Sequence, residues 1–238
     1  MAGNVSEPPS VSEPRVHLEA LHPATSAWLP RLAARPWCVE LYAAGSAALA
    51  LHLGHRPVRD LDLMGGSSRL RSPDRRDLLA DLLVLDPELR VESARDGYLF
   101  VRTGDGVGLK FFHYPYPLIG PEMDVLGLAT ASLLDLGLMK LAAIVSRGDR
   151  RDFVDLYLLC RELPLETLLA RAPEKFGHVG DFPLQALKGL ADIEAAAAEP
   201  LPRLAAPLSW SEVEAWTREQ VRRLGASHLG LEEGSTTG

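Results

Sequence analysis

Residues 41–63 read LYAAGSAALALHLGHRPVRDLDL, and this stretch decides the fold that the sequence predicts. It opens inside a short apolar run, residues 38–44, which is typical of a buried strand. Residues 46–53 then read as a helix with a serine as its N-cap and with Gly54 as its C-terminal stop. Residues 58–64 alternate between polar and apolar side chains, which indicates a second strand with one buried face.

The second expected strand carries two aspartates, Asp60 and Asp62. Residues i and i+2 of a strand lie on the same face, so we expect the two carboxylates to be roughly 6–7 Å apart. At that distance two negative charges repel by on the order of 2–3 kcal/mol if the effective dielectric constant is near 20. If the two carboxylates lie in a cleft, a divalent cation between them removes this repulsion. If they are exposed to solvent, water screens most of the repulsion. Ligation by oxygen alone favours Mg²⁺ or Mn²⁺, which commonly accompany phosphate groups.

Gly45 and Ser46 lie where the first expected strand passes into the helix. A helix N-terminus offers free backbone N–H groups and the positive end of the helix dipole, which together bind phosphate. A glycine at this point lets a phosphate approach the backbone, and the serine hydroxyl adds a hydrogen-bond donor. The same pair also occurs as an ordinary turn glycine followed by an N-cap serine, so these two residues alone do not decide the function.

The rest of the chain divides into a mixed half and a helical half. A helix that begins with proline and three strands separated by glycine-containing turns follow the first two strands. From about residue 130 the pattern is helical, and the last helix opens with a capping box from Ser209 to Glu212 and closes at Gly225. The remaining expected strands are residues 89–94, 98–103 and 107–113. The remaining expected helices are an irregular stretch at residues 16–34, which Pro23 and Pro30 interrupt, and residues 73–85, 132–147, 151–162, 165–172, 184–198 and 209–224.

This order of elements predicts an α+β protein: a mixed β-sheet core with flanking helices, followed by a helical domain. We expect a disordered tail at residues 1–14, the core at residues 15–128, the helical domain at residues 129–228 and a second disordered tail at residues 229–238. The first tail has neither the basic nor the apolar region of a secretory signal. Because no apolar run is long enough to span a membrane and the two cysteines lie far apart, we expect a cytoplasmic protein.

Three polar residues of the helical half, Lys140, Arg147 and Asp152, form a further candidate site. Lys140 and Arg147 are seven positions apart and therefore share one face of a helix, which is otherwise apolar. A lysine on such a face either extends its ammonium to solvent or reaches into a site. Arg147 can equally interact with the C-terminal end of the helix dipole, and Asp152 can simply pair with a neighbouring arginine.

Two segments in combination resemble the nucleotidyltransferase superfamily. Residues 41–63 are similar to its first motif, and the likeness is greatest to the AbiEii/AbiGii branch, known as toxins of abortive-infection and toxin–antitoxin systems. Residues 139–157, which read MKLAAIVSRGDRRDFVDLY, resemble the later motif of that branch. The resemblance covers about residues 42–198. The two motifs are specific together, in this order and at this spacing, where each alone is not.

The resemblance implies a metal-dependent nucleotidyltransferase, in which a hydroxyl attacks the α-phosphorus of a nucleoside triphosphate (NTP) and pyrophosphate leaves. For a toxin of this branch it implies a macromolecular acceptor, RNA such as tRNA, and a cognate antitoxin as partner. The implied roles are triphosphate binding by Gly45, Ser46, Lys140 and Arg147, binding of Mg²⁺ or Mn²⁺ by Asp60 and Asp62, completion of the site by Asp152, and assistance by Arg56.

One departure from the superfamily pattern concerns a third carboxylate, which many members place on a later core strand. The corresponding strand here, residues 107–113, reads VGLKFFH and contains no acid. Either Asp152 supplies the missing ligand, or the site holds a single metal ion, or activity has been lost.

Two alternatives to RNA modification therefore stay open. One is a catalytically inactive relative that binds nucleotide or a protein partner. The other is a small-molecule nucleotidyltransferase that modifies an aminoglycoside-like acceptor. The net charge of −7 would suit such a cationic acceptor, and it argues against broad, nonspecific binding of nucleic acid without excluding a local basic groove.

Overall fold

A computed structural model of the protein describes residues 15–66, 70 and 74–228. The strands are β1 (Tyr42–Ala44), β2 (Leu61–Gly65), β3 (Arg90–Arg95), β4 (Tyr98–Arg102), β5 (Gly108–His113), β6 (Met123–Val125) and β7 (Leu128–Thr130). They form one mixed sheet in the order β3-β4-β5-β2-β1-β7-β6. Two neighbouring pairs are parallel, β2 with β5 and β1 with β7, and the other pairs are antiparallel.

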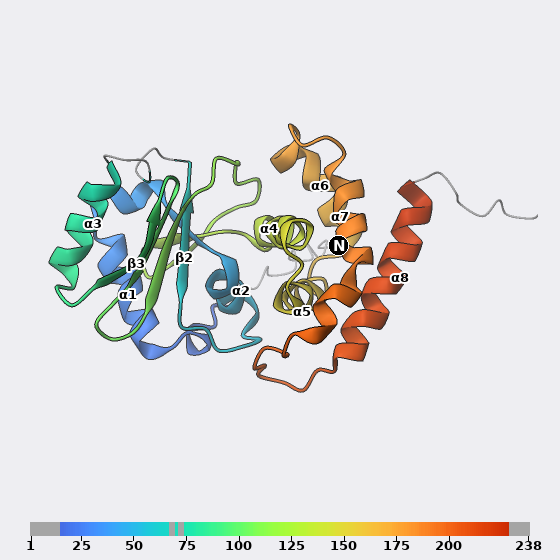
Figure 1. The fold of residues 1–238 in the computed structure, drawn as a ribbon, viewed down its shortest axis with the longest axis horizontal. Coiled ribbons are helices and arrows are strands. Elements are labelled where there is room, and N and C mark those ends of the chain that lie inside the picture. Colours follow the sequence, from blue (N-terminus) through green and yellow to red (C-terminus); the bar gives the residue numbers. More distant parts are fainter. Residues whose placement is uncertain (1–14, 67–69, 71–73, 229–238) are drawn as a thin grey trace, which may run out of the picture.

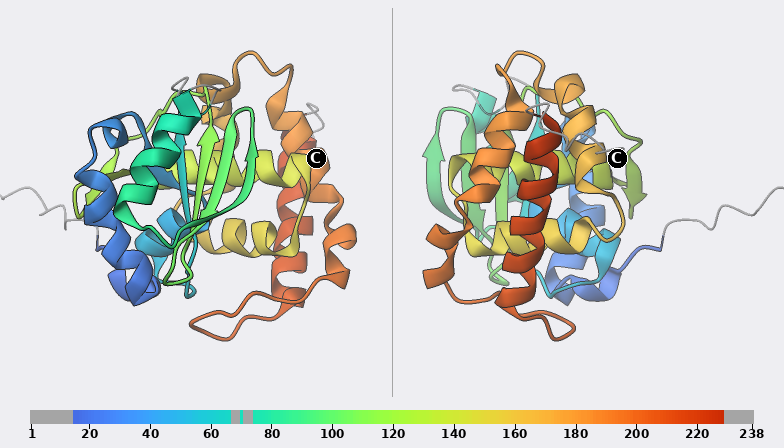
Figure 2. Two further views of the ribbon diagram at one scale, coloured as in Figure 1. Left: turned by 60° about the vertical axis from the view of Figure 1, so that its left-hand side comes forward. Right: turned by 90° about the vertical axis from the view of Figure 1, so that its right-hand side faces the viewer.

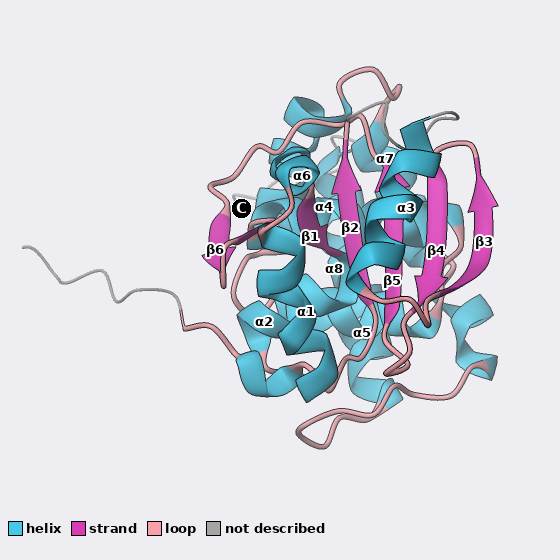
Figure 3. Ribbon diagram, turned by 90° about the vertical axis from the view of Figure 1, so that its left-hand side faces the viewer, coloured by secondary structure: helices cyan, strands magenta, loops and turns pink. Residues whose placement is uncertain are grey.

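Helices cover both faces of the sheet. The helices are α1 (Pro23–Ala33), α2 (Gly45–Leu53), α3 (Asp74–Leu85), α4 (Leu133–Ser146), α5 (Arg150–Leu159), α6 (Leu165–Phe176), α7 (Phe182–Ala191) and α8 (Trp210–His228), with short 3₁₀ helices η1 (Leu18–Ala20), η2 (Pro36–Glu40) and η4 (Ile193–Ala198). Figure 1 shows α1 and α3 on one side of the sheet, and α2 on the other side, toward the helical half. Figure 3 looks onto the sheet with α1 and α3 in front, and Figure 2 shows α8 across the outer surface of the helical half.

The position of α2 follows from its composition. Residues 47–51 of this helix are all buried, so the helix is apolar around its whole circumference. Such a helix is stable only when it is covered on all sides. It contacts β1 and β2 on one side and α4 and α5 on the other. The helix whose N-terminus is the predicted phosphate-binding element therefore connects the sheet to the helical half.

The predicted α+β class, with a mixed sheet, flanking helices and a following helical half, is confirmed. The two predicted tails, residues 1–14 and 229–238, lie outside the described residues. Within the described part of the chain, none of the helices combines the length and the apolar character that crossing a membrane requires.

The first two predicted strands are both longer than the observed ones. Pro36 begins η2, which takes up the first part of the strand predicted at residues 38–44, because the fixed φ of proline suits the first turn of a helix. β2 begins only at Leu61, so Asp60 lies immediately before the strand and not within it. Val58 forms a single isolated bridge instead.

The hairpin of β6 and β7 is absent from the sequence-based prediction. Its two-residue turn consists of Leu126 and Gly127, whose φ angles are 55° and 84°. Two-residue turns with positive φ angles favour Asn-Gly or Asp-Gly, and a leucine in this place gives no recognisable turn signal. β7 nevertheless supports the site, because Thr130 pairs with Ala43 in the strand that leads into α2.

Two helices of the second half differ from their predicted ranges. α6 does not end at residue 172 but continues through Pro173, because the buried side chain of Phe176 holds its last turn against the core. Residues 184–198 are not one helix, since α7 ends at Ala191 and the chain continues as η4.

α8 begins as predicted and ends later than predicted. The backbone N–H of Ser209 donates to Oε2 of Glu212 at 2.9 Å, and the backbone N–H of Glu212 donates to Oγ of Ser209 at 3.3 Å. These reciprocal bonds are those of the predicted capping box. The helix does not stop at Gly225 and extends to His228.

Candidate active site

The N-terminus of α2 lies directly against the carboxylate of Asp62. Gly45, the first residue of α2, has a φ of +61°, in the left-handed region that favours glycine. A Cβ atom at this position would lie 2.2 Å from Oδ2 of Asp62, so no other residue fits without displacing the carboxylate. The prediction that Ser46 is the N-cap is wrong, because Ala44 takes that place and Ser46 lies in the first turn of the helix.

Asp60 and Asp62 converge on the ammonium of Lys110. Its Nζ atom lies 2.8 Å from Oδ2 of Asp60 and 3.9 Å from Oδ1 of Asp62. Lys110 belongs to β5, where it is the register partner of Asp62 in the parallel β2–β5 pair. Asp60 also accepts a hydrogen bond of 3.1 Å from the backbone N–H of Gly108. Burial raises the pKa of the Asp62 carboxyl, and the positive charge of Lys110 opposes this effect only in part.

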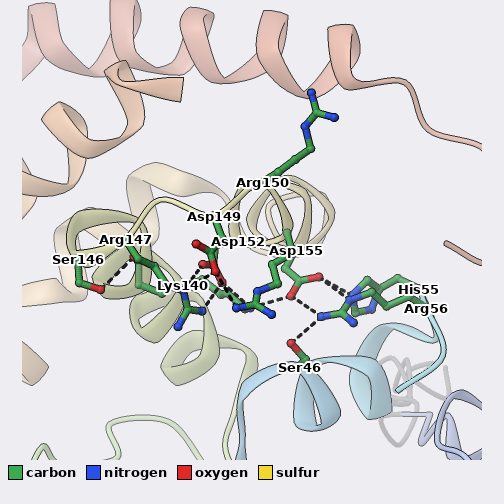
Figure 4. A network of polar contacts seen from close by, with 12 residues as sticks. Ser46, His55, Arg56, Lys140, Ser146, Arg147, Asp149, Arg150, Asp152 and Asp155 are labelled. Atoms are coloured by element: carbon green, nitrogen blue, oxygen red, sulfur yellow. Dashed lines mark hydrogen bonds and ion pairs between the residues drawn. The ribbon is translucent and has the colours of Figure 1, made fainter. Parts of the chain in front are cut away.

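A network of polar contacts joins Ser46 to the helical half (Figure 4). Nη2 of Arg56 donates to Oγ of Ser46 at 2.6 Å, and Arg56 also donates to both carboxylate oxygens of Asp155 at 2.9 and 3.1 Å. Asp155 is fully buried and further contacts Nζ of Lys140 at 2.7 Å and Nε2 of His55 at 3.0 Å. Burial by itself would raise the pKa of Asp155, but the neighbouring cations and hydrogen bonds outweigh it and hold this pKa well below its ordinary value.

Asp152 holds the two cations that were predicted to contact phosphate. Nζ of Lys140 lies 3.1 Å from its Oδ1, and Arg147 donates from Nε and Nη2 to the two oxygens at 2.8 and 3.0 Å. Such two-point contacts between a guanidinium and a carboxylate are strong and fix the orientation of both groups. Asp152 is fully buried, and both of its oxygens are engaged by cations.

A cleft of about 440 Å³ lies in front of these residues, a volume within the usual range for small-ligand sites. Cationic side chains outnumber acidic ones on its walls. The cations are Arg56, Arg59, Lys110, Arg147 and Arg151, and the acids are Asp60 and Asp62. A local excess of positive charge in a chain with a net charge of −7 indicates a site for a polyanion.

The structure brings together residues from both predicted motifs. Of the predicted site residues, Ser46, Asp60, Asp62 and Arg147 line the cleft, Gly45 lies against Asp62, and Lys140 and Asp152 are buried in the network behind it. Asp62 lies within electrostatic reach of both Lys140 and Arg147, whose positive charges act to lower its pKa. Arg147 and Arg151 line one cleft together with Asp60 and Asp62, so the helical half folds back onto the segment that carries the aspartates.

Lys110 and Asp155 are among the residues of the site that were not singled out from the sequence. Lys110 lies on the strand that, from the sequence, differs from the superfamily pattern by containing no acid. Its place opposite Asp62 follows from a pairing between strands that are distant in the chain. Asp155 follows Asp152 by three positions in the second motif, so its place on the same helix face was readable. Its buried contact with Arg56, which is 99 residues away in the chain, could not be predicted from the sequence.

The acidic residues present fit one Mg²⁺ ion that arrives together with a phosphate-bearing substrate. Among the described residues, no group of three or more His, Cys, Asp or Glu side chains could hold a metal ion. Asp60 and Asp62 are two carboxylates in an open cleft beside a helix N-terminus. Mg²⁺ is commonly held by one or two carboxylates together with the phosphates of the substrate, which is the donor set that this cleft would provide.

The sequence matches known proteins over most of its length. Residues 29–215 match the model of a family described as "Nucleotidyl transferase AbiEii toxin, Type IV TA system". A protein of Aquifex aeolicus that is named only as uncharacterized, aq_aa25, is 31% identical over 193 residues, which cover 78% of this chain and 88% of the relative.

The chain is also similar to solved structures. A candidate nucleotidyltransferase of Helicobacter pylori superposes with a TM-score of 0.51 at 16% identity, over 89% of this chain and 98% of the other. JHP933, also from Helicobacter pylori, gives a TM-score of 0.43 at 16% identity, over 89% of this chain and 96% of the other. The first of these similarities shows a common fold.

Proposed function

The chain belongs to the AbiEii family of nucleotidyl transferase toxins, and we propose that it transfers a nucleoside monophosphate from an NTP to an RNA acceptor such as tRNA. The observation that carries the proposal is the cleft, in which the carboxylate of Asp62 lies against the N-terminus of a buried helix and Asp60 and five cations line the walls. In the reaction the acceptor hydroxyl gives up its proton to solvent, its oxygen forms a bond to the α-phosphorus, and the bond from that phosphorus to the bridging oxygen of pyrophosphate breaks.

The N-terminus of α2 is the proposed triphosphate site. Its free backbone N–H groups and its dipole attract phosphate, and the left-handed Gly45 lets the Asp62 carboxylate lie directly against this helix start. Arg56 both contacts Ser46 and lines the cleft, so it orients the hydroxyl and adds positive charge. Asp60 and Asp62 would hold one Mg²⁺ ion, which would screen the phosphates and the charge that develops on the departing pyrophosphate.

Lys140 and Arg147 supply fixed positive charge from the helical half. Pyrophosphate departure develops negative charge, and cations that are held in place before the reaction stabilise this charge most effectively. Asp152 and Asp155 keep the two cations in place from behind, at the distances given above. We therefore assign Asp152 to positioning within the proposal, because its two oxygens are already engaged by Lys140 and Arg147.

An RNA acceptor suits the rim of the cleft. Arg59 on the side of the sheet and Arg151 on the side of the helices are both exposed and line the cleft. Exposed arginines that line one cleft can contact phosphates of a nucleic-acid backbone, although the guanidinium of Arg59 also donates to the backbone carbonyls of Asp105 and Gly106. A cognate antitoxin and a cytoplasmic location, where NTPs and tRNA occur, are parts of the same proposal.

The test is transfer of label from each of the four α-³²P NTPs in the presence of Mg²⁺, with total tRNA or with a panel of aminoglycosides as acceptor. We expect label on tRNA from at least one NTP, loss of this label with Asp62→Asn, and no change with Glu166→Gln, which alters an exposed carboxylate on α6. Label on an aminoglycoside but not on tRNA would point to a small-molecule enzyme. A folded protein that transfers no label from any NTP to either class of acceptor would be an inactive relative.

A further inference from the structure

β5 places a lysine opposite the central aspartate of the candidate active site. Lys110 is the register partner of Asp62, and adjacent strands of a sheet are about 4.8 Å apart. This is the strand on which the resemblance led us to expect a third carboxylate. The position beside the two aspartates is thus taken by a positive group instead of a negative one.

The ammonium of Lys110 is held in place from two sides. Asp60 contacts it at 2.8 Å and Asp62 at 3.9 Å. On its other neighbour, β4, the register partner is Phe100, whose ring centroid lies 5.3 Å from Nζ. A cation at this distance from an aromatic ring is attracted to its face. Lys110 is therefore oriented toward the aspartates before any substrate binds.

Stability alone does not account for this arrangement. The side chains of Lys110, Asp60 and Asp62 are 26%, 32% and 24% exposed, so all three groups are in contact with solvent in the cleft. Ion pairs that are partly exposed add little to the stability of a fold. A cation aimed between two partly exposed carboxylates of a cleft is better explained by the chemistry of the cleft.

We infer that Lys110 takes the place of one of the two metal ions of a two-metal site, so that this active site binds a single divalent ion. The inference rests on the proposed function and adds the role of one more residue to it. Paired catalytic metal ions lie about 3.5–4 Å apart and share carboxylate ligands. Here Oδ2 of Asp60 is already engaged by an ammonium at 2.8 Å, so a second divalent ion that shared this oxygen would have to compete with Lys110.

The charges at the site support the same conclusion. Two carboxylates and one ammonium leave a single negative charge, which one Mg²⁺ ion outweighs, so that a net positive charge remains to attract the triphosphate. A second divalent ion would have to lie next to the ammonium, and like charges at such short range repel. Arg102 adds to this repulsion, because its Nη1 lies 3.7 Å from Oδ1 of Asp60.

The test counts Mn²⁺ ions bound per chain by electron paramagnetic resonance, with Mn²⁺ alone and with each of the four α,β-methylene NTP analogues. The wild-type protein is expected to bind one Mn²⁺ per bound nucleotide and to give the spectrum of an isolated ion. Lys110→Asp, which introduces a third carboxylate, is expected to bind two ions and to give the exchange-coupled spectrum of a close pair. Lys110→Met, which removes the charge without adding a ligand, is the matched control and is expected to bind one.

Two Mn²⁺ ions per nucleotide in the wild-type protein would overturn the inference, and so would a single ion in folded Lys110→Asp. If circular dichroism shows that this variant does not fold, Lys110→Glu is measured in its place. The number of Mn²⁺ ions bound by the wild-type protein tests the inference even without a folded variant. The proposed function is judged separately by label transfer. A protein that transfers label and binds two ions keeps its function and refutes the inference, whereas a protein that binds neither an analogue nor Mn²⁺ refutes both.

Discussion

Arg56 and Asp155, 99 residues apart in the chain, form a two-point ion pair that joins the two halves of the protein. Arg56 follows α2 and Asp155 lies on α5, and the same guanidinium donates to Ser46 at the start of α2. The end of α2 that faces the cleft is therefore fixed by a residue of the helical half. Damage to this pair should affect both the stability of the fold and the geometry of the site.

Asp155→Ala is expected to lower the free energy of unfolding by about 3–5 kcal/mol, because it leaves buried cations without their common partner. The matched control is Glu166→Ala, which removes the carboxylate of an exposed pair with Arg223 and should have a much smaller effect. Urea unfolding followed by circular dichroism measures both variants. Equal effects of the two substitutions would contradict the assignment of Asp155 as a central buried anchor.

The stability of the protein should depend on pH through Asp155. Its pKa is held well below the ordinary value by the surrounding cations, which outweigh the effect of burial. A carboxyl whose pKa is lower in the folded than in the unfolded state stabilises the fold fully above the unfolded pKa of about 3.9. This contribution is lost as the pH falls from there through the folded pKa. We expect the wild-type free energy of unfolding to fall more steeply below pH 4 than that of Asp155→Asn, and parallel curves would contradict this.

The part of the site that is formed by residues close together in the chain could be predicted from the sequence. The part that depends on pairing between distant segments could not. Gly45 with Ser46, and Asp60 with Asp62, are each readable because the first pair marks the start of a helix and the second the start of a strand. The contact of Lys110 with the aspartates depends on the parallel pairing of β2 with β5, and β3 and β4 intervene between these strands in the chain. No local pattern encodes that register.

The same distinction explains the errors in the fold. The hairpin of β6 and β7 is held by pairing with β1, while its own turn residue Leu126 is a poor turn former. α6 continues through Pro173 because tertiary contacts of Phe176 outweigh the local preference to end. Helix starts marked by capping side chains, such as that of α8 at Ser209, were predicted correctly because the signal lies within four residues.

Gly45→Ala is expected to abolish nucleotide binding and to destabilise the fold. The left-handed backbone costs a residue with a Cβ about 1–2 kcal/mol, and the new methyl group would displace the carboxylate of Asp62. The control is Gly225→Ala in α8, where a Cβ would meet nothing within 4 Å and where alanine favours the helix. Calorimetric titration with Mg²⁺ and NTP, together with thermal unfolding, measures both effects. Normal nucleotide affinity in Gly45→Ala would show that the triphosphate does not bind at this helix terminus.

Trp210, at the start of α8, is expected to support the fold without a part in the chemistry. Its ring meets Phe153 of α5 edge-on at 6.2 Å between centroids, and the guanidinium of Arg150 lies 4.4 Å from its centre. Val213, one turn later, is fully buried. Trp210→Ala should therefore lower the melting temperature by several degrees while the affinity for NTP stays nearly unchanged. A folded variant with a selective loss of NTP affinity would contradict this assignment.

Lys140 and Asp152 provide the decisive test of the active site, and the network predicts that both can be replaced without loss of the fold. Without Lys140, Asp152 keeps Arg147 as its partner. Without Asp152, Lys140 keeps Asp155 as its partner at 2.7 Å. We expect Lys140→Ala and Asp152→Ala each to reduce label transfer by about a hundredfold or more, the typical effect of removing one preplaced charge-stabilising group.

The affinity for Mn²⁺ distinguishes the two roles that Asp152 could have. A positioning residue acts through Lys140 and Arg147, so Asp152→Asn should weaken transfer and NTP binding and leave the affinity for Mn²⁺ unchanged. A metal ligand would instead lose Mn²⁺ affinity in the same variant, as Asp62→Asn should. Because Asp152 is buried and contacts Lys140 and Arg147, we expect Asp152→Asn to keep its affinity for Mn²⁺. An equal loss of Mn²⁺ affinity in Asp152→Asn and Asp62→Asn would show that Asp152 is a metal ligand. Robust transfer by both alanine variants would place the chemistry elsewhere in the molecule.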